Sequence, residues 1–381
     1  MKKIEKIVGL VLSLCLTFGA FSSVVSFAAE EVGAKKAYEK NAESFYTSLR
    51  FKEDFAVISV RGRSQTSELV YPDNFGGLYI DSDNELHIAY TDNKETLMNK
   101  VGEDEAIFEK VDYGYNYLNG IFEYITALMC TGETSISQAY VDETTNRVAV
   151  YLEASLRDEL IVDLKESFGD FDENAISFRD AEPIVTTSAA GAGIVVTDGA
   201  ATAGYNAQDY DGNYGFVTCG HGFTGLWESA YNLNGSLLGT VTYRNFISST
   251  SVDAAFVEYE NQNDATNQYL GGGVISGVMP SSSLAIGMSV SKYGNATGLQ
   301  SGTVSSVNTS VQFVHGDGAT RVLNNQVALN TNQQKGDSGC AVVYSGNVVG
   351  IATLSNLTNA AWVSKAENIN SRFDLTVYLA E

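Results

Sequence analysis

The chain has 381 residues, 44% of them hydrophobic, and a formal net charge of −23. Proteins that bind nucleic acid or anionic lipid use clustered Lys and Arg, so this charge argues against both kinds of partner. The length predicts two folded units, and 36 Gly and 21 Tyr beside only 3 Pro favour turn-rich β structure.

Residues 1–28 have the pattern of a secretory signal peptide. Lysines at the start precede an apolar run over residues 7–21, and Ser26-Phe27-Ala28 forms a small-x-small cleavage site. The apolar run is shorter than the ~20 residues that a membrane-spanning helix needs. We therefore expect a secreted, extracellular protein with no stable membrane insertion.

Residues 29–186 form an acidic segment of mixed character. They contain 32 acidic and 14 basic residues, whereas residues 187–381 contain 13 acidic and 6 basic residues. This change in charge density marks a domain boundary near residues 183–188. Alternating and helical hydrophobic patterns predict an α+β domain with strands at 76–81, 85–90 and 141–150 and helices at 115–129 and 156–168.

From residue 191 onward helical periodicity nearly disappears. Two sets of short strands are separated by Gly and Asn turns, a pattern that favours two packed β-barrels. A terminal helix or extended arm is expected at 369–379. The strands of the two sets are expected at 194–196, 215–218, 239–243 and 254–257, and at 274–275, 289–293, 302–304, 327–329, 341–344 and 348–352.

Three motifs in this all-β part carry residues suited to nucleophilic catalysis. Ser338 lies in Gly-Asp-Ser-Gly, where flanking glycines leave its hydroxyl accessible. His221, one of three histidines, ends the stretch Phe-Val-Thr-Cys-Gly-His. Asp253 precedes an apolar strand. The chain order His, Asp, Ser is that of chymotrypsin and neither that of subtilisin nor that of the α/β-hydrolases.

On these motifs, residues 190–381 resemble the trypsin/chymotrypsin-type serine proteases, most of all the bacterial α-lytic protease and streptogrisin branch. The resemblance implies a double β-barrel endopeptidase made as a zymogen. Residues 29–186 then correspond to a pro-domain that acts as foldase and inhibitor, and residues 187–381 to the protease domain. The Gly-Gly-x-Tyr-x-Asp pattern at residues 76–81 is loosely similar to pro-segments of that group.

The resemblance also assigns roles to individual residues. Ser338 is the expected nucleophile, His221 the general base, and Asp253 the group that orients the imidazole, with Asp264 as the fallback. The backbone N–H groups of Gly336 and Ser338 would form the oxyanion hole, each donor contributing ~3–4 kcal/mol to acyl transfer.

Asp337 needs a partner, because a carboxylate buried beside the nucleophile must be paired. In bacterial relatives a cation at a strand end of the second barrel serves this purpose. The matching segment here is Ser291–Gly298, with Lys292 at the position of the cation, where the relatives carry Arg. We expect a Lys292–Asp337 ion pair that fixes the oxyanion loop.

The cysteines depart from the family pattern. Cys219 lies two residues before His221 and Cys340 two residues after Ser338, and these are the only two thiols in the expected protease domain. One interpretation is two small buried residues in a packed interface. The other, which we favour, is a Cys219–Cys340 disulfide that joins the barrels, as export would permit.

Thr353, Leu354 and Ser355 match the edge segment that pairs with the substrate backbone in relatives. No Asp stands at the expected base of the specificity pocket, where the sequence offers Asn332 or Gln333, so a preference for neutral side chains is predicted. His87 is interpreted as a half-buried strand residue and His315 as an exposed loop residue.

The partners expected are therefore a peptide or protein substrate and the pro-domain itself. No metal or organic cofactor is called for, and a monomer is expected. A rival interpretation is a catalytically inactive secreted binding protein on a protease-like scaffold. A third interpretation is that the acidic N-terminal half is a permanent adhesion domain, which predicts no cleavage near residues 183–190.

Overall fold

The structure is a computed structural model that describes residues 27–61, 64–102, 104–132, 134–169, 171–181, 185–186, 193–269 and 273–379. The predicted signal peptide lies almost wholly outside these residues. The chain divides into two compact units, residues 1–40 and 41–381. Within the described ranges no helix is both long enough and apolar enough to span a bilayer.

The acidic segment is α+β, as its hydrophobic patterns predict. Strands β3 to β5 form a three-stranded sheet, and β1 and β2 form a separate hairpin. Helix α4 packs its apolar face, which includes Ile121 and Ile125, against strands β6 and β7. The elements are α2 (Phe27–Glu53), β1 (Ala56–Arg61), β2 (Ser64–Leu69), β3 (Phe75–Ile80), β4 (Leu86–Tyr90), α3 (Glu95–Val101), β5 (Ile107–Lys110), α4 (Tyr115–Thr131), β6 (Gln138–Asp142), β7 (Arg147–Tyr151), α5 (Arg157–Ser167), β8 (Ile176–Arg179) and β9 (Val185–Thr186).

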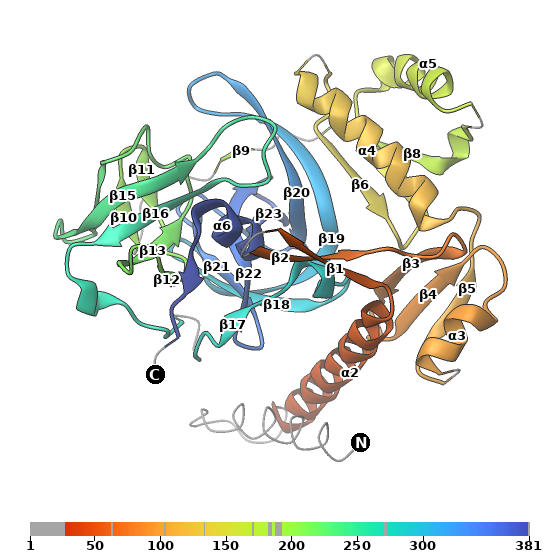
Figure 1. Ribbon diagram of the computed structural model, residues 1–381, viewed down its shortest axis with the longest axis horizontal. Coiled ribbons are helices and arrows are strands. Elements are labelled where there is room, and N and C mark those ends of the chain that lie inside the picture. The colour runs from red at the N-terminus through yellow and green to blue at the C-terminus, as the bar shows by residue number, and fades with distance from the viewer. Residues whose placement is uncertain are drawn as a thin grey trace. The chain divides into compact units, whose positions relative to one another are not determined.

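The first set of β-strands forms an eight-stranded sheet in the order β11-β10-β14-β15-β16-β13-β12-β24, drawn mainly in green in Figure 1. Its core contains Phe216, Val241 and Val257. Strands β13 and β16 lie at its centre and pair antiparallel, with Thr218 opposite Ala255. The strands are β10 (Ile194–Val196), β11 (Gly199–Ala201), β12 (Asn206–Gln208), β13 (Tyr214–Thr218), β14 (Ser229–Asn232), β15 (Leu237–Asn245), β16 (Ala254–Tyr259) and β24 (Thr376–Val377).

The second set lies in an eleven-stranded sheet with the path β18-β21-β22-β23-β20-β19-β6-β7-β8. Pairing of β18 with β19 brings the first and last of its C-terminal strands together, so these strands close on themselves (Figure 1). Strands β17 and β9 pair with β22 outside this path. The elements are β17 (Gly277–Val278), β18 (Ser289–Gly294), β19 (Gly298–Val314), β20 (Thr320–Asn330), β21 (Ala341–Tyr344), β22 (Asn347–Ser355), β23 (Ala360–Lys365) and α6 (Ala366–Phe373).

The sheet contains one feature that the sequence patterns do not indicate. Strand β6 of the acidic segment pairs antiparallel with β19, with Thr309 opposite Tyr140. The acidic segment therefore extends the second sheet through β6, β7 and β8. At the C-terminus both expected forms are present, a helix at Ala366–Phe373 and then the short strand β24.

Candidate active site

His221 and Asp253 meet because β13 and β16 are paired neighbours. His221 follows the end of β13, and Asp253 directly precedes β16. Nδ1 of His221 lies 2.6 Å from Oδ2 of Asp253, and both side chains are fully buried. The other carboxylate oxygen of Asp253 accepts the backbone N–H groups of Gly220 and His221 at 2.8 and 2.9 Å. Asp264, the fallback candidate, instead accepts the side-chain amide of Asn261.

The Asp253 segment is also held from the second sheet. The Asp253 N–H donates to Oγ of Ser364 at 3.1 Å, and this hydroxyl donates to the amide oxygen of Gln326 at 3.0 Å. Ser364 lies on β23 and Gln326 on β20. Neither residue stands out in the sequence, because isolated Ser and Gln residues within strands carry no motif.

The carboxylate changes the basicity of the imidazole. Burial alone would lower the pKa of His221, but the charge and hydrogen bond of Asp253, together with Cys219, outweigh it and raise this pKa well above its ordinary value. An imidazolium formed at this position is therefore stabilised.

Ser338 lies on the loop between β20 and β21 and is fully buried. Its hydroxyl donates to the carbonyl oxygen of Thr353 at 3.0 Å. Nε2 of His221 is buried and makes no hydrogen bond to any residue that the structure describes. The serine and the imidazole are therefore not hydrogen-bonded in this structure.

Gly339 explains how the serine loop comes so close to the histidine strand. Its φ is +91°, and a Cβ at this position would lie 2.2 Å from Oγ1 of Thr218, 2.3 Å from the carbonyl oxygen of Thr202 and 3.0 Å from the nitrogen of Cys219. Only glycine fits both the conformation and the space. The loop therefore lies directly against the end of β13, two residues before His221.

Thr202 is a second residue that the sequence does not single out. Its N–H donates to the carbonyl oxygen of Ser338 at 2.7 Å, and its hydroxyl donates to that of Gly336 at 2.7 Å. Thr202 is 2% exposed. These two bonds fix both ends of the Gly336–Ser338 segment, in which Gly336 has a φ of +104°.

Asp337 is anchored by a buried cation. Nζ of Lys292 lies 3.1 Å from Oδ2 of Asp337, and both side chains are almost completely buried. The carboxylate also accepts the Thr297 hydroxyl at 2.7 Å and the backbone N–H groups of Ala296 and Thr297 at 2.9 and 3.1 Å. Burial by itself would raise the pKa of Asp337, but Lys292 and these hydrogen bonds lower it below the ordinary value.

The favoured disulfide is absent, so that prediction is wrong for this structure. Cys219 and Cys340 are both buried free thiols. Burial raises the pKa of Cys340 to about 12, and the thiolate is the form that reacts in disulfide formation. The two cysteines belong to different hydrophobic clusters, where they fill space as small apolar residues.

The expected substrate segment forms the last part of β22. There Leu354 pairs with Thr186 and Ser355 with Val185, so the short strand β9 lies antiparallel to it. Thr353, the preceding residue, is the one whose carbonyl contacts Ser338. The segment Thr353–Ser355 is therefore next to Ser338 and carries the strand β9 of this chain.

The other two histidines lie in different surroundings. His87 is a buried residue of β4 whose ring nitrogens contact Glu109 and Asp81 at 2.9 and 3.1 Å. His315, expected to be exposed, is half-buried, with its ring centroid 6.2 Å from that of His221. The long hairpin of β19 and β20, which the sequence does not predict, brings it there.

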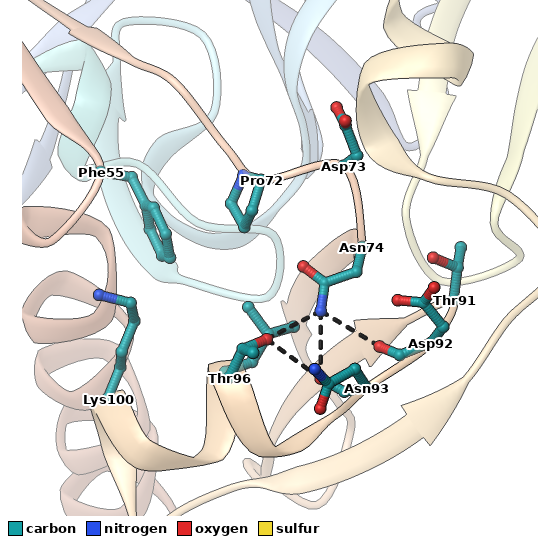
Figure 2. Close-up of a pocket in the computed structure, with 10 residues that line it drawn as sticks. Phe55, Pro72, Asp73, Asn74, Thr91, Asp92, Asn93, Thr96 and Lys100 are labelled. Atoms are coloured by element: carbon teal, nitrogen blue, oxygen red, sulfur yellow. Dashed lines mark hydrogen bonds between the residues drawn. The ribbon is translucent and has the colours of Figure 1, made fainter.

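A hollow of about 460 Å³ lies away from these residues, in the acidic segment. Figure 2 shows that Asn74 points toward Asp92, Asn93 and Thr96. The Asn74 amide donates to the carbonyl oxygens of Asp92 and Asn93 and to the Thr96 hydroxyl. The polar groups thus satisfy one another, and this hollow provides no catalytic set. No group of three or more His, Cys, Asp or Glu side chains suited to a metal occurs among the described residues.

Comparison with known proteins finds similarity to bacterial serine proteases. The chain is 27% identical over 158 residues to serine protease 2 of Streptomyces fradiae, a match that covers 41% of this chain and 86% of the relative. Among solved structures, the Nocardiopsis protease has 22% identity and a TM-score of 0.40, and covers 50% of this chain and 100% of its own. Protease A of Thermobifida fusca has 20% identity and a TM-score of 0.40, with coverages of 51% and 100%. No family model matches the chain.

The similarity to the Streptomyces enzyme supports a bacterial serine protease, a serine-type endopeptidase, as the class of this chain.

Proposed function

We propose that the protein hydrolyses peptide bonds through an acyl-enzyme formed on Ser338, with His221 as general base and Asp253 as its orienting carboxylate. The observation that carries the proposal is the buried contact of 2.6 Å between His221 and Asp253. It fixes Nδ1 as the protonated nitrogen facing the carboxylate and leaves Nε2 with a lone pair to accept a proton.

The reaction then follows from these positions. The Ser338 oxygen attacks the carbonyl carbon of the substrate while Nε2 of His221 takes its proton, and the carbonyl electrons move onto oxygen. When this intermediate collapses, the carbon–nitrogen bond breaks and the imidazolium gives its proton to the leaving amine. Water repeats the sequence on the acyl-enzyme with the same base and releases the acid product.

The developing oxyanion would be bound by the backbone N–H groups of Gly336 and Ser338. Thr202 supports this role, because it donates hydrogen bonds to the carbonyl groups of both residues and so holds the segment in place. The Lys292–Asp337 pair fixes the residue between them. Donors held in place before reaction stabilise the transition state without reorganisation.

Residues 29–186 are proposed to be an inhibitory and folding-assisting pro-domain of an exported zymogen. The pairing of β9 with β22 supports inhibition, because β9 lies on the edge proposed for the substrate. We propose that the processing bond lies within residues 183–190, next to this strand.

A rival function, that of an inactive binding protein, is favoured by one observation. The Ser338 hydroxyl donates to Thr353, and Nε2 of His221 makes no hydrogen bond within the part of the chain that the structure describes. Stopped-flow hydrolysis of an activated ester by the processed protein separates the two. The proposal predicts a burst of one product equivalent per enzyme, lost in Ser338→Ala and in His221→Ala. Equal rates in the parent and both variants would support the rival.

A further inference from the structure

Two arginines flank the aromatic ring that lies beside the catalytic imidazole. The Phe246 and His221 ring centroids are 5.8 Å apart. Cζ of Arg321 lies 4.6 Å and Cζ of Arg244 lies 5.7 Å from the Phe246 centroid. His315 makes an edge contact with the same ring at 4.8 Å. Contacts of this kind hold a guanidinium at a defined position over the ring face.

The two arginines differ in how their charge is compensated. Asp317 binds Arg321 through two hydrogen bonds of 2.9 and 2.6 Å. Arg244 donates its Nε–H to the carbonyl oxygen of Gly220 at 2.9 Å, and it forms no ion pair among the residues that the structure describes. A half-buried guanidinium thus lies next to the catalytic centre without a carboxylate partner.

These two arginines stand out against the composition of the protease half. Residues 187–381 contain only 6 Lys and Arg beside 13 Asp and Glu. Two of those cations are buried. Lys292 pairs with Asp337, and the Lys365 ammonium donates a hydrogen bond to the Asn325 side chain. Arg244 and Arg321 make up half of the remaining four, and both contact one ring beside His221.

The strand register indicates which substrate residue would reach this group. A residue directly opposite Leu354 projects its side chain on the same face of the sheet as Leu354. Leu354 packs in one cluster with Phe246. Because Thr353 adjoins Ser338, the substrate residue paired with Leu354 is the one that precedes the cleaved residue, position P2. Its side chain is therefore directed toward Phe246 and the two arginines.

We propose that Arg244, with Arg321, forms a P2 subsite that selects an acidic side chain, so that the protein prefers to cleave one residue after Asp or Glu. This inference rests on the proposed peptidase function. A P2 carboxylate would provide the partner that Arg244 lacks, and a guanidinium binds a carboxylate through two parallel hydrogen bonds. The contact of Phe246 with His221 places that ion pair beside the reacting bond.

The test is cleavage of a mixed peptide library by the processed protein, obtained by expressing the full chain, with mass spectrometry of the fragments. For the parent we expect Asp and Glu at P2 to be cleaved about tenfold or more in excess of Asn and Gln. In Arg244→Gln the excess should fall to about twofold or less, while peptides with neutral P2 residues are cleaved as before. Arg372→Gln, which removes an exposed guanidinium at the end of α6, should retain the excess.

The outcomes separate the two levels of the proposal. No peptide cleavage by the parent would overturn the proposed function itself and the inference with it. Cleavage without acidic enrichment at P2, or an equal loss for acidic and neutral peptides in Arg244→Gln, would overturn only the inference. An equal loss for acidic and neutral peptides would mean that Arg244 acts solely by holding the Gly220 carbonyl. Arg244→Lys keeps the charge and should retain part of the acidic excess.

Discussion

At the scale of residues, the pairing of His221 with Asp253 has a consequence for pH dependence. The pKa of His221 is raised well above its ordinary value of about 6.5. Only the neutral imidazole can accept the serine proton, so kcat/KM should rise with pH through this raised pKa. We expect the midpoint of the acidic limb above pH 6.5 in a pH–rate profile. Asp253→Asn should move that midpoint to lower pH and reduce kcat by about 10⁴-fold. A parent midpoint well below 6.5 would contradict this account.

Lys292 provides a second test at this scale. In Lys292→Met the Asp337 carboxylate stays buried without its cation, which should lower the free energy of unfolding by about 3–5 kcal/mol. Urea unfolding of the full chain carrying Ser338→Ala measures this without self-cleavage. Because Asp337 has a lowered pKa, its contribution is present above the ordinary carboxyl pKa and is lost as the pH falls through the lowered value.

A double variant controls for this result. Lys292→Met combined with Asp337→Asn removes the buried charge altogether and should recover part of the lost stability. It should not recover activity, since the oxyanion loop would still lack its anchor. Full activity in Lys292→Met alone would refute the role given to the pair.

Gly339→Ala tests the close approach of the serine loop. The added methyl would collide with the carbonyl oxygen of Thr202 at 2.3 Å, and the φ of +91° is strained for alanine by about 1–3 kcal/mol. Hydrolysis should fall by orders of magnitude in a peptide assay. Gly225→Ala is the matched control, because its methyl would meet only Glu228 at 3.6 Å. Equal activity of the two variants would argue against this packing.

The candidate catalytic residues could be singled out from sequence because they lie in short motifs that backbone geometry requires. Gly-Asp-Ser-Gly and Thr-Cys-Gly-His are of this kind. Thr202, Ser364 and His315 could not be predicted, because each acts through contacts made by distant strands. The prediction of a Cys219–Cys340 disulfide was wrong for a related reason. The spacing of these cysteines from His221 and Ser338 does not reveal whether the two thiols lie in the same hydrophobic cluster.

At the scale of elements, the short strand β9 leads to a prediction for processing. If its pairing with Leu354 and Ser355 holds the chain in the substrate position, the exported product should begin within residues 183–190. N-terminal sequencing checks this, and Ser338→Ala should keep residues 29–186 attached. Cleavage outside residues 183–190, or cleavage that persists in Ser338→Ala, would contradict self-processing next to this strand.

The hairpin of β19 and β20 shows where sequence patterns stop being informative. Residues 302–304 and 327–329 were expected as short strands, whereas the hairpin runs over Gly298–Val314 and Thr320–Asn330. Residues 305–310 within it are rich in Ser, Thr and Asn. Those residues become strand because β6 pairs with them, and the buried Ser310 hydroxyl bonds that of Thr126 at 2.8 Å. Such a strand depends on a partner 170 or so residues earlier in the chain, as the pairing of Thr309 with Tyr140 indicates.

At the scale of the whole molecule, the acidic segment shares a hydrophobic core with the second sheet. Phe45, Phe51 and Phe75 belong to the same buried cluster as Val342 and Val349, and the Phe45 and Tyr344 rings lie 4.6 Å apart. Strand pairing between distant segments makes folding slow. A segment that buries part of this core and extends its sheet can assist folding before it is removed.

This arrangement predicts that residues 187–381 expressed alone will accumulate little active protein. Adding residues 29–186 as a separate chain should restore activity, measured as burst amplitude after refolding. A variant with Phe45→Ala and Phe75→Ala in the separate chain should restore less, because it removes two large side chains from the shared core. Full activity of residues 187–381 without the acidic segment would contradict the proposed role of that segment in folding.

The central claim is that Ser338 is a nucleophile activated by His221. Reaction of the processed protein with a peptidyl organophosphonate, followed by mass spectrometry of the labelled peptide, tests it most directly. We predict one covalent adduct per molecule, located on Ser338, with no adduct in Ser338→Ala and slow labelling in His221→Ala. Absence of an adduct on Ser338 in the parent protein, or a label on another residue that persists in Ser338→Ala, would contradict the account.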